Sequence, residues 1–116
     1  MILAAVAALT VQVPEAPPEG VPTDAQLQRV RSELDLKLLD YPKARFRDVR
    51  ADRYRVCGLV NAPNRMGAGT GWTKFGALGA GEDVLLYIDD EHMSEVFCTD
   101  ALMRTTRDYS TEVTHR

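Results

Sequence analysis

Apolar side chains recur at helical spacing in the segment that follows residue 23. Four of them fall on one helix face: Leu27, Val30, Leu34 and Leu38. Just before them, Thr23 and Gln26 match a capping box, in which each side chain accepts the backbone N–H of the other residue. Pro42 disfavours helical backbone in the residue before it. The pattern predicts one amphipathic helix, from about Asp24 to Leu39.

The hydrophobic period changes to two after Pro42, and this is the repeat of a half-buried strand. Candidate strands lie at residues 44–50, 54–61, 72–75 and 83–89, with turn residues densest at 61–71 and 76–81. Residues 92–104 fit a helix as well as a strand. The elements predict an α+β domain, in which one N-terminal amphipathic helix packs on a small antiparallel sheet of three to five strands.

The two ends of the chain differ from this middle part. Residues 1–13 carry no charge and are mostly apolar, yet they are fewer than the roughly 20 that a membrane-spanning helix needs. An apolar run followed by the Pro-rich segment 14–22 is typical of a signal peptide and a linker; the alternative is an ordinary N-terminus or a first strand. We expect a periplasmic or secreted protein without an integral membrane span. The single domain should occupy residues 23–104, and residues 105–116 should form a polar tail.

Length and cysteine content fit this expectation. With 116 residues, 45% of them hydrophobic and 27% charged, the chain corresponds to one globular domain. In an oxidising compartment, Cys57 and Cys98 can form a disulfide that contributes about 3–4 kcal/mol. In the cytosol they would be two buried thiols. The sequence leaves both alternatives open.

Charge is distributed unevenly along the chain. The net charge of −3 argues against a dedicated nucleic-acid-binding protein. Residues 43–55 nevertheless carry a net charge of +4, whereas residues 82–100 carry −7. Arg45 and Arg47 would share a strand face and could bind an anionic partner such as a phosphate backbone or an acidic envelope polymer. The alternative, which we favour, is that the oppositely charged strands lie side by side and pair across the sheet.

Segment 61–74 contains the other candidate binding residues. Asn61, Asn64, Arg65 and Trp72 lie among glycines whose backbone N–H groups could converge on an anion. Neither phosphate-binding fingerprint fits, because Trp72 and Thr73 occupy positions that require glycine and lysine. A long hairpin loop with local Asn–backbone hydrogen bonds is the simpler interpretation. In that interpretation Trp72 packs over the core.

Catalysis receives little support from the sequence. A cysteine-dependent hydrolase would use Cys57 or Cys98 as nucleophile, His92 as base and Asp89 or Asp90 to orient it. A cysteine in mid-strand, however, suits a buried thiol or a disulfide better than a reactive thiolate. Four adjacent residues, 89–92, cannot all face one metal ion. We therefore assign no catalytic residue, metal ligand or cofactor.

Several residues between positions 39 and 75 follow a recognisable order: Pro42, Ala44, Phe46 and Val49, then Cys57-Gly58, Val60-Asn61, Asn64 and Gly71-Trp72. This order resembles a family of small, mostly uncharacterised exported bacterial proteins. The resemblance implies export and a small α+β fold, and it implies no catalytic residue. We expect an exported small domain that acts as a binding or interaction module of the cell envelope, with an envelope protein or an anionic polymer as its partner.

Overall fold

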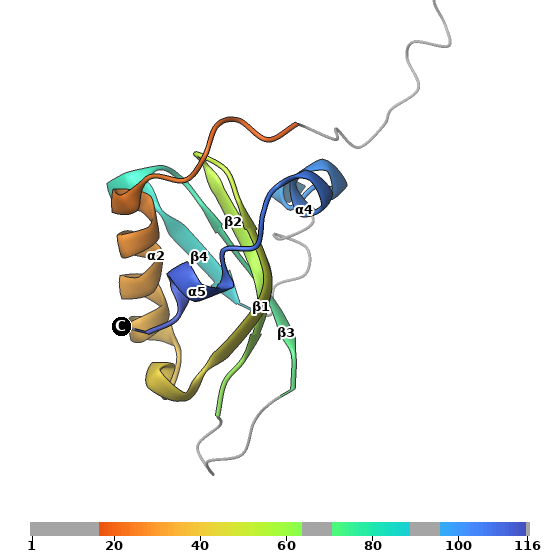
Figure 1. Cartoon of the computed structure of the whole chain (residues 1–116). Coiled ribbons are helices and arrows are strands. Elements are labelled where there is room, and N and C mark those ends of the chain that lie inside the picture. The colour runs from red at the N-terminus through yellow and green to blue at the C-terminus, as the bar shows by residue number, and fades with distance from the viewer. Residues whose placement is uncertain (1–16, 64–70, 89–95, 116) are drawn as a thin grey trace, which may run out of the picture.

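The structure is a computed structural model that describes residues 17–63, 71–88 and 96–115. Helix α2 (Asp24–Lys37) lies along one face of a four-stranded antiparallel sheet (Figure 1). The strands are adjacent in chain order: β1 (Arg45–Ala51), β2 (Arg55–Asn61), β3 (Thr73–Leu78) and β4 (Leu85–Ile88). Two single-turn 3-10 helices, η1 (Tyr41–Lys43) and η2 (Gly81–Asp83), precede β1 and β4. After the sheet, the described residues include the short helices α4 (Asp100–Thr105) and α5 (Ser110–Val113). The predicted α+β fold is confirmed.

Helix α2 begins where the sequence predicts. The Thr23 hydroxyl accepts the N–H of Gln26 at 3.1 Å, and the Gln26 side chain accepts the N–H of Thr23 at 3.3 Å. The helix buries Leu27, Val30 and Leu34 against the sheet. It ends two residues earlier than predicted, since its C-cap residue Leu38 already has extended backbone.

The two faces of the sheet have different partners. Because strand side chains alternate, β2 turns Val56 and Val60 toward α2 and turns Cys57 and Leu59 to the opposite side. We call that opposite side the outer face. At one end of the outer face, Phe97 and Leu102 pack over Cys57 and form a second, smaller apolar cluster. A Cβ atom at Gly76 would lie 2.8 Å from the Phe97 ring, so the close approach of this segment to β3 requires glycine.

The C-terminal segment differs from the expected polar tail. Tyr109 and Val113 are buried in the main core. The N–H of Tyr109 donates to the Val49 carbonyl of edge strand β1 at 2.6 Å, and Arg31 of α2 donates to the Glu112 carbonyl at 2.7 Å. The prediction was wrong for this segment because two apolar residues among polar ones give too weak a periodic signal.

The Pro-rich segment also proves to be part of the fold as far back as it is described. The N–H of Glu19 donates to Asp52 at 3.0 Å, and the N–H of Arg53 donates to the Glu19 carbonyl at 3.1 Å. Residues 1–16, which carry the signal-like pattern, lie outside the described part of the chain. Within that part, no helix is long and apolar enough to cross a membrane.

Candidate functional site on the outer sheet face

A β-bulge places three arginines of β1 on the outer face. Arg47 pairs with Leu59 and Arg50 with Cys57, so β1 holds one residue more than β2 over this stretch. Asp48, which has φ 53°, is the residue in left-handed conformation at the bulge. The extra residue returns Arg50 to the side of Arg45 and Arg47. Val49, which precedes Arg50, is fully buried in the main core on the other side of the sheet.

Side chains from the neighbouring strands extend this basic surface. Leu59 of β2 pairs with Arg47 on one side and with Lys74 of β3 on the other, so the three form a row across the sheet. Asn61 pairs with Arg45 and continues the outer face toward the end that lies away from Phe97 and Leu102. We refer to Arg45, Arg47, Asn61, Trp72 and Lys74 as the basic strip.

The predicted packing of Trp72 over the core is wrong. Trp72 precedes β3 and is 39% exposed. The guanidinium of Arg47 lies over its ring, 4.3 Å from the centroid. This cation–π contact holds both side chains on the surface, where part of the indole remains exposed to solvent. Asn64 and Arg65, the two remaining loop candidates, lie outside the described residues.

The cations of the basic strip have no acidic partners among the residues that the structure describes. No ion pair there involves Arg45, Arg47 or Lys74, and all three side chains are exposed. The expectation that the oppositely charged strands lie side by side is wrong, because β1 and β4 are the two opposite edges of the sheet. The acidic residues of 89–95 lie outside the described part of the chain.

A cavity of about 450 Å³ adjoins the basic strip. Leu59, Lys74 and the Cys57–Cys98 bridge line it from the side of the sheet, and Met103 and Asp100 line it from α4. Arg50 also lines the cavity; its guanidinium donates to the Thr106 carbonyl at 2.6 Å and lies 3.9 Å from Asp48. The cavity therefore combines an apolar wall with cationic side chains at its edge.

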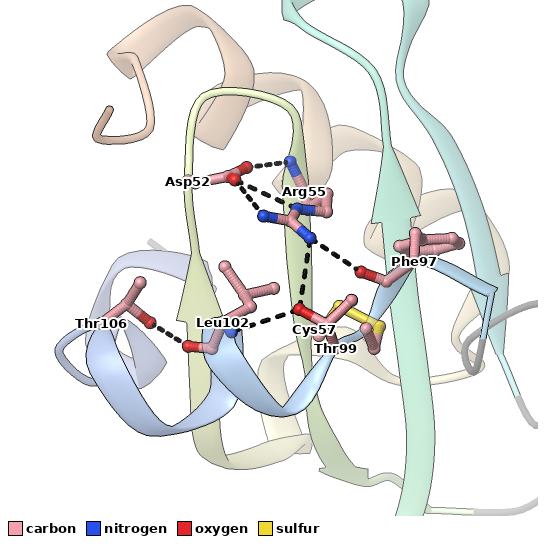
Figure 2. Close-up of a disulfide and its surroundings, with 8 residues drawn as sticks. Asp52, Arg55, Cys57, Phe97, Thr99, Leu102 and Thr106 are labelled. Carbon is pink, nitrogen blue, oxygen red and sulfur yellow. Dashed lines mark hydrogen bonds and ion pairs between the residues drawn. A yellow bond between two sulfur atoms is a disulfide. The ribbon is translucent and has the colours of Figure 1, made fainter. Parts of the chain in front are cut away.

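The disulfide between Cys57 and Cys98, one of the two alternatives that the sequence left open, is formed (Figure 2). It joins the middle of β2 to the segment that leads into α4, across 41 residues of chain. Both thiols are consumed, and neither is available as a nucleophile. The other members of the hydrolase hypothesis, Asp89, Asp90 and His92, lie outside the described residues.

Beside the disulfide, a buried ion pair connects three parts of the chain (Figure 2). Arg55, 7% exposed, donates to Asp52, which is 1% exposed, through Nε at 3.0 Å and Nη2 at 2.6 Å. The guanidinium also donates to the carbonyls of Pro17 and Phe97. Burial by itself would raise the pKa of Asp52, but hydrogen bonds from Arg55 and from the N–H groups of Glu19 and Tyr54, with the charge of Arg55, lower that pKa below the usual value for aspartate. This pair positions the N-terminal segment and the α4 segment, and it lies apart from the basic strip.

The sheet thus brings together four of the six residues that the sequence singled out: Arg45, Arg47, Asn61 and Trp72. Lys74, the last residue of the segment 61–74 that the sequence indicated as a candidate anion site, joins them, because its pairing with Leu59 places it on the outer face. Sequence reasoning missed Arg50, because only the bulge returns that residue to the outer face. In the described ranges, no group of three His, Cys, Asp or Glu side chains could hold a metal ion.

Comparison of the chain with protein-family models, with curated proteins and with solved structures gives no significant match.

Proposed function

We propose that this protein is an exported, non-catalytic binding domain of the cell envelope, and that it binds an anionic polymer along the basic strip. One observation carries the proposal. Arg45, Arg47 and Lys74 are exposed on the same sheet face, and no acidic side chain of the described residues forms an ion pair with them. Unpaired cations in a row are the electrostatic signature of a surface for a polyanion.

The spacing and shape of these groups suit a linear ligand. Residues two apart on a strand lie about 7 Å apart, so Arg45 and Arg47 present two guanidinium groups along one line. A guanidinium binds a carboxylate or phosphate with two parallel hydrogen bonds. Trp72 adds a flat apolar surface beside Arg47, on which a ring of the ligand can lie.

Export is supported by the disulfide and by the N-terminal sequence. Disulfides such as Cys57–Cys98 persist in oxidising compartments and are rare in the cytosol. The apolar segment 1–13 has the character of a signal peptide. An exported protein meets the acidic polysaccharides of the envelope, so the compartment favours such a polymer over nucleic acid as the ligand.

Binding to polygalacturonate, with uncharged dextran as the comparison polymer, tests the ligand class. We expect binding to polygalacturonate that falls steeply with salt, and no binding to dextran. The double variant Arg45→Ala/Arg47→Ala should bind at least about tenfold more weakly. Arg29→Ala/Arg53→Ala removes the same charge from exposed positions away from the strip and should bind like the parent protein. Equal losses in both double variants would show a net-charge effect and contradict the proposal.

The compartment is tested separately in the native host. Fractionation followed by mass spectrometry should find the protein outside the cytosol, with an N-terminus upstream of the docked Glu19 and no free thiol. A cytosolic protein with two free thiols would overturn the export half of the proposal.

A further inference from the structure

The cavity beside the basic strip has the size and lining of a small-molecule site. Its volume of about 450 Å³ lies within the range of about 300–1,000 Å³ that is usual for ligand pockets. We propose that it binds a single-chain anionic amphiphile, with the hydrocarbon chain in the cavity and the acidic head group on Lys74. This inference concerns a different surface from the polymer site, although Lys74 belongs to both.

The apolar lining argues for a hydrocarbon chain. Leu59 is half-buried at the centre of the outer face, and Met103 of α4 packs only partly against the small cluster around Cys57. The disulfide contributes a further surface without hydrogen-bonding capacity. A flexible thioether such as that of Met103 adapts to chains of different shape, and displacing water from such walls favours an apolar ligand.

The charges at the cavity argue for an acidic head group. Two acidic residues line it, Asp48 and Asp100, and Asp48 already lies 3.9 Å from the Arg50 guanidinium. The lining also holds two cations, Arg50 and Lys74. Lys74 is exposed and forms no ion pair with any described residue, so it is the lining cation that is open to an acidic head group.

The test uses the full-length, disulfide-bonded protein and three probes that separate head from chain. Decanoate has both, acetate has only the acidic head, and decyl maltoside has only the ten-carbon chain. Calorimetric titration below the micellar concentration should show saturable binding of decanoate, no measurable binding of acetate, and binding of decyl maltoside that is about tenfold weaker or less.

Variants then locate the site. Lys74→Gln should weaken decanoate binding to the level of decyl maltoside binding, because it removes only the lysine charge that binds the carboxylate. Leu59→Ser should weaken both decyl probes, and Leu36→Ser, at a position of α2 that is 78% exposed, should weaken neither. Met103→Ser repeats the test on α4 if Leu59→Ser does not fold, as judged by its thermal transition.

Several results would overturn the inference. Equal affinity for decanoate and decyl maltoside would exclude the acidic head, and equal effects of Leu59→Ser and Leu36→Ser would exclude the cavity. Binding to phosphatidylglycerol vesicles without binding to monomeric decanoate would assign the surface to a membrane. If Arg45→Ala/Arg47→Ala loses polygalacturonate binding but still binds decanoate, the result supports a cavity site that is separate from the polymer site. If the parent protein binds polygalacturonate but not decanoate, the result contradicts this inference and leaves the proposed function intact.

Discussion

At the scale of single residues, Asp48 determines which side chains reach the outer face. Its left-handed backbone, with φ 53°, is a conformation that aspartate tolerates and β-branched residues do not. We expect Asp48→Val to lower the free energy of unfolding by about 1–2 kcal/mol. Asp48→Gly should be about as stable as the parent protein, because glycine adopts this conformation freely. Urea unfolding of the two variants measures the difference, and equal stabilities would show that the bulge does not depend on this residue.

The sequence predicted the side chains of the outer face correctly only as far as Asp48. Strict alternation correctly places Arg45 and Arg47 on one face. It assigns Arg50 to the other face, because no periodic pattern reveals one inserted residue. Trp72 was misjudged for a related reason: the size of an indole predicts burial, whereas the nearby Arg47 guanidinium provides a surface partner that only the strand register brings within reach.

At the scale of elements, the long periodic segments were predictable and the shortest were not. Helix α2 has a capping box and a stripe of apolar residues that only a helix can align. The strands have clear alternation, although β4 (Leu85–Ile88) is shorter than its apolar run. Helix α5 has four residues, and its existence depends on contacts with α2 and β1 that are remote in sequence.

Those contacts make the C-terminal segment a structural element whose removal can be tested. Val113 is fully buried, and the Tyr41 hydroxyl donates to its carbonyl oxygen. We expect Val113→Ala to reduce the free energy of unfolding by about 2 kcal/mol, since it leaves a cavity in the main core. Thr111→Ala, at an exposed position of the same helix, should change it by less than about 0.5 kcal/mol. Thermal unfolding with the two variants side by side provides the measurement. Similar small effects in both would mean that the segment frays in solution, as the sequence alone suggested.

At the scale of the whole molecule, two linkages hold the outer-face elements in place. The disulfide fixes Cys98 to β2, and Arg55 of the buried pair holds the Phe97 carbonyl (Figure 2). The same guanidinium holds the Pro17 carbonyl, so both segments are fixed to the turn between β1 and β2. The spacing of the cysteines left the bridge undecided, because sequence does not give the distance between two Cα atoms. Nothing in the sequence distinguishes Asp52 from Asp48, although one is buried and the other exposed. That difference arises only when three distant segments meet at the Arg55 guanidinium.

This buried pair makes a prediction about the response of the whole fold to acid. Because the pKa of Asp52 is lowered in the folded state, its carboxylate stabilises the protein above the unfolded-state pKa of about 3.9. The contribution is lost as pH falls further, through the folded-state pKa. Asp52→Asn should lower the free energy of unfolding at pH 7 by about 3 kcal/mol or more, since it leaves the Arg55 charge buried without its counter-ion.

When the free energy of unfolding is plotted against pH, the curves of the parent protein and Asp52→Asn should therefore converge below pH 4, because the parent loses the same interaction by protonation. Asp35→Asn changes an exposed carboxylate of α2 and should run parallel to the parent throughout. Urea unfolding from pH 7 to pH 2.5 gives the three curves. If Asp52→Asn also runs parallel to the parent below pH 4, the carboxylate does not couple the N-terminal segment, the β1–β2 turn and the α4 segment, and their association must rest on the disulfide and the apolar contacts alone.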